Sequence, residues 1–193
     1  MTGSKKSVVV LISGSGTNLQ ALIDSGIPIA LVVSNKKNAY GLTRASNSSI
    51  PTLVLTLKAH KDAGKSRNDY DIHLAKEIKK LLPPPYLIVL AGFMHILSES
   101  FITEFDTIIN LHPALPGQFD GTHAIRRAYE AFKAGQITTS GVMVHRVVPE
   151  VDKGEPLLTR EVEFKEDDTL EAFEARMHAT EHELIVQATK SLL

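Results

Sequence analysis

The 193-residue chain contains no cysteine. This absence excludes disulfide bonds, thiolate metal sites and a cysteine nucleophile. A long apolar run that could cross a membrane is also missing, and the polar start Met1–Ser7 lacks the apolar stretch of a signal peptide. The sequence therefore predicts a cytoplasmic protein with no membrane partner.

The chain also lacks an excess of charge of either sign, because 21 basic and 22 acidic residues give a formal net charge of −1. The basic residues are scattered along the chain, which argues against nucleic-acid binding. A content of 43% hydrophobic and 22% charged residues is typical of an ordinary globular protein. Repeats, low-complexity tracts and linkers are absent, so we expect a single domain over residues 1–193.

Apolar runs that alternate with helical patterns indicate the fold class. Val8–Ile12, Ile29–Val33 and Tyr86–Leu90 are typical of strands buried on both faces of a parallel sheet. Ser140–Val148 and Pro156–Phe164 flank a short turn and predict an antiparallel hairpin. The sequence therefore predicts an α/β fold whose mainly parallel sheet has antiparallel strands near the C-terminus.

A glycine-serine loop, Ser13–Asn18, follows the first strand and leads into a predicted helix, Leu19–Asp24. Free backbone N–H groups and the positive end of the helix dipole suit a phosphate there, although such a loop also serves simply to pack a helix closely. The dinucleotide fingerprint is incomplete, because Leu19 replaces its third glycine and the second strand ends in Ser34 and Asn35 instead of an acid. NAD is therefore not expected as a cofactor.

Asn110 and His112 follow an apolar run and precede Pro113. Side chains at positions i and i+2 of an extended segment point to the same side, and Pro113 disfavours a helical conformation at His112. An amide and an imidazole held together could stabilise an oxygen that becomes negative during a reaction; the alternative is a strand end that caps its own turn. No metal is expected, since the chain lacks cysteine and His112, His123 and His145 form no helical i, i+4 pair.

Other candidate residues are scattered along the chain. The charged stretch Lys58–Ser66 predicts a mobile loop, and Arg67 then opens a helix, where a lone arginine is usually an exposed charge. Phe93–Leu97, after the strand Tyr86–Leu90, would either pack in the core or form the wall of a slot for a flat ligand. Glu181 falls within the apolar stripe of the last helix, so its carboxylate needs a basic partner or donors from a ligand.

Four segments together carry a resemblance to a known family: Val8–Asp24, Leu90–Leu97, Asn110–Gly117 and Gly141–Pro156. They resemble the phosphoribosylglycinamide formyltransferases, and the turns Pro-Ala-Leu-Pro-Gly and Val-Asp-Lys-Gly-Glu-Pro resemble the stand-alone fungal form. The resemblance implies a Rossmann-like, doubly wound fold. It also implies transfer of a formyl group from 10-formyltetrahydrofolate, as cosubstrate, to the glycyl amine of glycinamide ribonucleotide in purine (IMP) synthesis.

The resemblance also implies a role for particular residues. The catalytic residues would be Asn110, His112 and Asp152. The nucleotide would be bound by Gly16, Thr17, Asn18, Leu19 and Gln20, in a half covering roughly residues 1–100, and by Glu181 from the other half. The folate would be bound by Arg67, Met94, His95, Ile96, Leu97, Asn110, Val148, Pro149, Glu150, Val151 and Asp152, mostly in the half covering roughly residues 101–193. Many bacterial members have arginine where His95 stands.

The chemistry of formyl transfer explains the catalytic group. Attack of an amine on the formyl carbon creates a negative oxygen and a positive nitrogen; Asn110 and a protonated His112 would donate to that oxygen. Asp152 would keep His112 protonated near neutral pH and help to move the proton, although it lies 40 positions (152 − 112) further along the chain. On the residues alone, Asp152 could equally be a turn residue that bonds its own backbone.

Two alternatives remain open at this point. A formyltetrahydrofolate hydrolase of the same fold would transfer the formyl group to water, and a non-catalytic module would only bind a nucleotide. A methionyl-tRNA formyltransferase would carry an additional basic domain, for which 193 residues leave no room. All partners expected here are small molecules, and a weak homodimer is compatible with the sequence.

Overall fold

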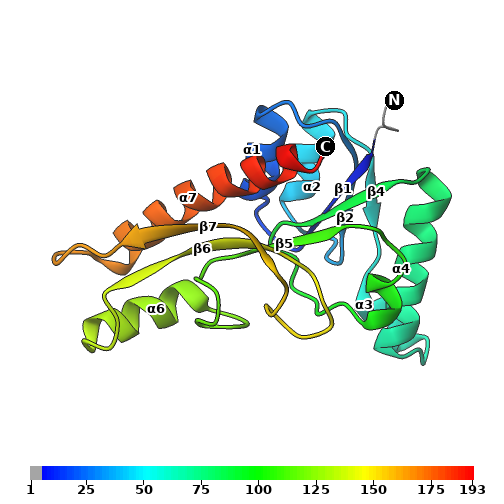
Figure 1. Cartoon of the computed structure of the whole chain (residues 1–193). Helices are drawn as coiled ribbons and strands as arrows, with labels where there is room; N and C mark the ends of the chain where they lie inside the picture. The colour runs from blue at the N-terminus through cyan, green and yellow to red at the C-terminus, as the bar shows by residue number, and fades with distance from the viewer. Residues whose placement is uncertain (1–5) are drawn as a thin grey trace.

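The computed structural model describes residues 6–193, and its strands form one sheet in the order β3-β2-β1-β4-β5-β6-β7 (Figure 1). Its first five strands are parallel and the last two pair antiparallel. This confirms the predicted α/β fold with antiparallel strands near the C-terminus. The strands are β1 Ser7–Ile12, β2 Ile29–Ser34, β3 Thr52–Val54, β4 Tyr86–Leu90, β5 Ile108–His112, β6 Thr139–Arg146 and β7 Pro156–Glu163.

Helices cover both faces of this sheet (Figure 1). Successive residues of β1 point to opposite faces, so Val8 and Val10 pack with the helices α1 and α7, whereas Val9 and Leu11 pack with α4. Two apolar cores therefore enclose the sheet. The helices are α1 Thr17–Asp24, α2 Gly41–Asn47, α3 Leu57–Asp62, α4 Arg67–Leu81, α5 Glu99–Ile102, α6 Ala124–Lys133 and α7 Leu170–Ser191.

The prediction of a loop over Lys58–Ser66 is wrong for its first part, which forms α3. The Thr56 hydroxyl caps this helix by accepting a hydrogen bond from the Ala59 N–H. His60 is buried edge-on against Tyr70 of α4, with 5.1 Å between ring centroids. Packing of His60 against the following helix stabilises the segment, and the local excess of charge gave no sign of this contact.

The carboxyl ends of β1, β4 and β5 lie side by side at one edge of the sheet (Figure 1). β5 extends further than its apolar run suggested and includes Asn110 and His112, which pair with His145 and Met143 of β6. Sheet hydrogen bonds therefore hold these two polar residues in an extended conformation. None of the helices within residues 6–193 combines the length and the apolar composition needed to cross a membrane.

Candidate active site

A cavity of about 1000 Å³ opens at the carboxyl ends of β1, β4 and β5. The glycine loop before α1 forms one end, and the segments after β4 and between β6 and β7 form other walls. Leu19 and Gln20 are the two predicted site residues that do not line it. The predicted residues in its lining are Gly16, Thr17, Asn18, Arg67, Met94, His95, Ile96, Leu97, Asn110, His112, Val148, Pro149, Glu150, Val151, Asp152 and Glu181.

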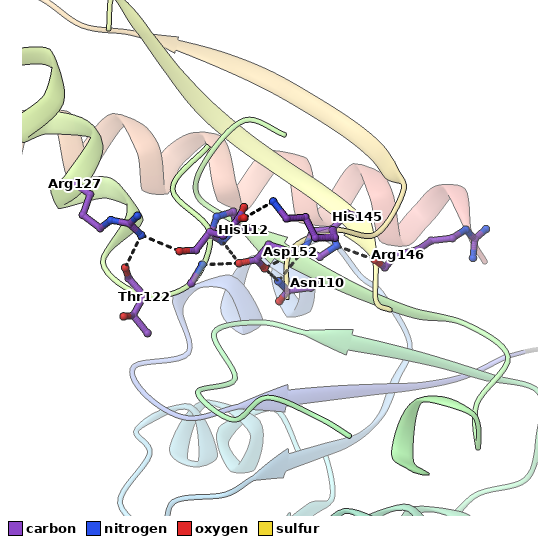
Figure 2. A network of polar contacts seen from close by, with 10 residues as sticks. Asn110, His112, Thr122, Arg127, His145, Arg146 and Asp152 are labelled. Atoms are coloured by element: carbon purple, nitrogen blue, oxygen red, sulfur yellow. Dashed lines mark hydrogen bonds and ion pairs between the residues drawn. The ribbon is translucent and has the colours of Figure 1, made fainter. Parts of the chain in front are cut away.

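Asp152 lies at the centre of a polar cluster on the cavity wall (Figure 2). One carboxylate oxygen, Oδ2, is 3.5 Å from His112 Nδ1 and accepts a hydrogen bond of 2.8 Å from the Gly121 N–H. The other, Oδ1, accepts a bond of 3.3 Å from the amide of Asn110. The fold thus brings Asp152 to both residues with which the sequence analysis grouped it.

The turn between β6 and β7 holds Asp152 in a left-handed conformation, with φ of 56°. Aspartate tolerates this conformation better than most residues do. Gly154 packs directly on β6, where an added Cβ would lie 1.6 Å from the carbonyl oxygen of Arg146. An ion pair between Lys153 and Asp120 fastens the turn to the loop that supplies the Gly121 N–H.

The glycine loop forms the opposite end of the cavity. Gly16 adopts a left-handed conformation, with φ of 72°, as the residue that precedes α1. A Cβ on Gly16 would lie 2.6 Å from Cα of Gly41, so α2 also presses against the loop. The N–H groups of the first turn of α1 have no partner within the helix, and they make this end of the cavity suitable for an anion.

Comparison with known proteins decides the family. Residues 6–189 match the family model described as formyl transferase. The chain belongs to the formyl transferase family. A phosphoribosylglycinamide formyltransferase of Schizosaccharomyces pombe is 48% identical over 97% of this chain and 97% of that protein. The enzyme of the same name from Saccharomyces cerevisiae is 44% identical over 96% of each chain.

The solved structures agree with this family assignment. A crystal structure of phosphoribosylglycinamide formyltransferase from Streptococcus pneumoniae superposes with a TM-score of 0.88. It is 31% identical in sequence, and the match covers 97% of this chain and 99% of that one. The resemblance to stand-alone fungal formyltransferases and the Rossmann-like fold of this family are therefore confirmed.

His145 also belongs to the polar cluster around Asp152, and the sequence had given it no role (Figure 2). Its Nδ1 is 2.8 Å from the carbonyl oxygen of Arg146, which can only accept, so Nδ1 carries a proton. In the neutral ring Nε2 then accepts from the Asn110 amide, 3.2 Å away. His145 therefore orients Asn110, and only the pairing of β5 with β6 places the two residues opposite each other.

The pKa of His112 is shifted in the direction opposite to the one expected from the sequence. Burial lowers the pKa of His112 below its usual 6.5, and the nearby Asp152 carboxylate offsets this only in part. Burial also raises the pKa of Asp152, but the His145 ring beside it and the hydrogen bond from the Gly121 N–H outweigh burial and keep the pKa below its usual 3.8. The lowered pKa of His112 therefore runs against the expectation of an imidazolium near neutral pH, whereas the lowered pKa of Asp152 agrees with a carboxylate.

The lowered pKa of His112 can be tested by titration. We expect NMR of the ring to give a pKa below 6.5, and a still lower value in Asp152→Asn, because the substitution removes the charge that favours the imidazolium. Since the unfolded chain then binds the proton more tightly than the folded one, His112 makes stability rise with pH across this range. A higher His112 pKa in Asp152→Asn would contradict this electrostatic account.

The segment after β4 is divided between the core and the cavity. Leu97 is buried with 5% exposure, whereas Met94 and Ile96 are 67% and 59% exposed and line the cavity. The alternative that the whole segment packs in the core is therefore wrong. The side chain of His95 is only 3% exposed, because its Nε2 lies 2.6 Å from the carboxylate of Asp71 inside the protein.

Some of the residues predicted to bind the nucleotide line the cavity, and others do not. Leu19 is fully buried in the core, and the Gln20 side chain donates to Asp24 and accepts from Arg44, so neither side chain lines the cavity. Glu181 is 6% exposed and does line it. His178, at 2.5 Å, supplies the basic partner that this carboxylate was expected to need, and the hydrogen bond raises the pKa of His178. Within residues 6–193, no three His, Cys, Asp or Glu side chains are grouped so as to hold a metal ion.

Proposed function

We propose that the chain transfers the formyl group of 10-formyltetrahydrofolate to the glycyl amine of glycinamide ribonucleotide in purine synthesis. The convergence of Asn110, His112 and Asp152 in one cavity with the glycine loop carries this proposal. The relatives from Schizosaccharomyces pombe and Saccharomyces cerevisiae support it, because they bear the name of this activity and align over nearly their full length.

The two ends of the cavity suit two different substrates. At the glycine loop, the N–H groups of Thr17, Asn18 and Leu19 in the first turn of α1 would bind the nucleotide phosphate. Glu181 would accept hydrogen bonds from hydroxyl groups of the nucleotide. On the other side, Met94, Ile96 and Val151 expose apolar side chains to the cavity, as a flat pterin ring requires. Arg67, also in the lining, would face the acidic part of the folate.

The neutral state of His112 suggests how one proton moves through the reaction. Its Nε2 is buried and has no hydrogen-bond partner among the described residues, whereas Nδ1 faces Asp152. As the amine attacks the formyl carbon, Nε2 would take the proton that the amine loses, directly or through water. The Asp152 carboxylate stabilises the imidazolium so formed. When the bond from the formyl carbon to the folate nitrogen breaks, the imidazolium gives this proton to the folate nitrogen. His112 is then neutral again, and the proton lost by the amine is accounted for.

Asn110 would stabilise the negative oxygen of the tetrahedral intermediate. In the structure its amide nitrogen is 3.2 Å from His145 and 3.3 Å from Asp152, so both N–H groups have acceptors. A negative oxygen bound nearby would replace the weaker of these contacts, while His145 continues to hold the amide in place. One such donor contributes on the order of 3 kcal/mol to lowering a barrier of this kind.

A formyl-transfer assay tests the proposal directly. We expect the absorbance change of folate deformylation when glycinamide ribonucleotide is present and almost none when it is omitted. Deformylation that does not depend on the nucleotide would instead identify a hydrolase. Saturable nucleotide binding without deformylation would identify a non-catalytic module.

Substitution of Gly16 by alanine tests the phosphate end. The added Cβ would meet the backbone of Gly41 at 2.6 Å and would sit on a left-handed residue, so the loop must move. We expect the KM for the nucleotide to rise at least about tenfold, on the scale of a lost charge-assisted hydrogen bond, with a smaller effect on the KM for folate. Gly64→Ala is the matched control, because Gly64 is also left-handed but has open space around it. A nucleotide KM equal to that of the control would contradict this assignment.

The remaining sequence predictions form part of the same proposal. The continuous sheet that joins residues 6–100 to residues 101–193 supports a single domain. We further propose that the chain acts on small molecules in the cytoplasm, without nucleic acid, metal or NAD. A weak homodimer stays a prediction, which sedimentation across a range of protein concentrations would test.

A further inference from the structure

Asp71 is a buried carboxylate outside the catalytic cluster. It lies on α4, is 1% exposed and does not line the cavity. Its Oδ1 is 2.6 Å from His95 Nε2, and its Oδ2 accepts a hydrogen bond of 2.7 Å from the Ser98 N–H. A buried carboxylate is costly unless it is well paired, and both partners of Asp71 belong to the segment after β4.

The charge on Asp71 determines which nitrogen of His95 carries a proton. Burial raises the pKa of Asp71, but the hydrogen bonds from His95 and Ser98 outweigh burial and hold the pKa below 3.8. The ionised carboxylate can only accept, so His95 Nε2 must donate. In a neutral ring Nδ1 is then an acceptor, and it lies 3.5 Å from Nη2 of Arg67.

Arg67 is thereby linked to the segment that lines the cavity. Its Nη2 also donates to the carbonyl oxygen of Ile96, at 3.4 Å. The other end of the segment is held independently, since the Met94 N–H donates to the Ser13 hydroxyl at 2.7 Å and that hydroxyl donates to Asn35 at 2.6 Å. The exposed side chains of Met94 and Ile96 therefore lie between two buried polar anchors.

We propose that Asp71 and His95 are positioning residues that hold Arg67 and the segment Met94–Leu97 in place for the folate. This inference rests on the proposed function and refines it, because it removes the His95 ring from the folate contacts and assigns it to the support of Arg67. The carboxylates of folate belong to its glutamate part, and they are the natural partners of a guanidinium group.

Two substitutions of His95 distinguish this role from simple packing. In His95→Gln, the amide N–H can still donate to Asp71 and the amide oxygen can still accept from Arg67. His95→Phe keeps a ring between Tyr70 and Phe93 but loses both hydrogen bonds. We expect His95→Phe to raise the KM for 10-formyltetrahydrofolate about tenfold, the scale of a lost hydrogen bond to a charged group, and His95→Gln to stay within about twofold of the wild type.

Asp71→Asn should act in the same direction. The amide of the new asparagine can donate to His95 Nε2, and the ring proton would then move to Nδ1. Nδ1–H and the Arg67 guanidinium are both donors, so the hydrogen bond between His95 and Arg67 would be lost. We expect kcat at saturating folate and the KM for the nucleotide to change by less than about twofold. With 10-formyltetrahydropteroate, which lacks the glutamate, the effects of Asp71→Asn and His95→Phe on KM should largely disappear. Glu77→Gln, on the same helix but paired with Lys80 at the surface, is the matched control.

The result separates this inference from the proposed function. Calorimetric titration of every variant with tetrahydrofolate measures cosubstrate binding even if the wild type transfers no formyl group, an outcome that would refute the proposed function alone. The inference is overturned if His95→Phe binds tetrahydrofolate as the wild type does. It is also overturned if His95→Phe and His95→Gln lose affinity for tetrahydrofolate equally. The same holds if the variants lose as much with the pteroate form of the cosubstrate, which lacks the glutamate, as with the folate. Should Asp71→Asn fail to fold, the His95 pair still decides the question.

Discussion

Asp152→Asn is expected to lower kcat for formyl transfer roughly 10³-fold while leaving the protein folded. In the proposed mechanism, the imidazolium at His112 would lose its counter-charge, the Asp152 carboxylate, which lies 3.5 Å from Nδ1 in the structure. Asparagine accepts the left-handed conformation of residue 152 and can still accept the hydrogen bond from the Gly121 N–H. Steady-state kinetics from pH 6 to pH 9, together with thermal unfolding, measure the two effects separately.

Asp167→Asn provides the control for this prediction, because it also removes one negative charge but at an exposed position before α7. We expect it to retain wild-type turnover. If Asp152→Asn kept nearly full activity across the pH range, stabilisation of the His112 cation by Asp152 would be refuted. A loss of activity that merely followed a loss of folded protein would also contradict the proposed role.

Gly154→Ala is the second change with a large expected effect, although Gly154 itself does not line the cavity. The new Cβ would lie 1.6 Å from the Arg146 carbonyl oxygen and 3.2 Å from His145 Nδ1, so the turn must move away from β6. Such overpacking costs about 1–3 kcal/mol of stability. Because Asp152 lies two residues earlier, a displacement of about 1 Å would lower kcat roughly 100-fold.

Thermal unfolding and steady-state kinetics of Gly154→Ala test both parts of this prediction. Gly26→Ala is the matched control: Gly26 is left-handed, with φ of 74°, but has no atom within 4 Å of an added Cβ. We expect Gly26→Ala to lose some stability and to keep its turnover. Equal turnover in Gly154→Ala and Gly26→Ala would show that close packing of the turn on β6 does not position Asp152.

Much of the fold follows from local patterns. The apolar runs at β1, β2 and β4 predicted buried strands because strands covered on both faces exclude polar residues over their whole length. The prediction of a loop over Lys58–Ser66 was wrong for its first part because a packing contact, and not the local composition, determines the structure there. The first residues of this segment form α3 through the burial of His60 against Tyr70 of the next helix, a packing contact that the charged composition of the segment does not indicate.

The candidate site was predictable in its composition but not in its geometry. The motif Asn110, Leu111, His112 and Pro113 indicated a polar pair on an extended segment, and the family resemblance added Asp152. His145 had no comparable signal, because its place opposite Asn110 depends on the register between β5 and β6. The role of His95 was likewise hidden, since its carboxylate partner Asp71 lies 24 positions earlier on a helix.

The sequence by itself determined the class of the fold, the family and the residue types that the reaction needs, because periodicity and motifs are local properties of the chain. Tertiary structure alone decided the protonation of His112, the orientation of Asn110 and the engagement of His95 with Asp71. The physical reason is that hydrogen-bond geometry and desolvation depend on distances between segments that are far apart in the chain. Burial thus lowers the pKa of His112, where the charged neighbour alone suggested a raised one.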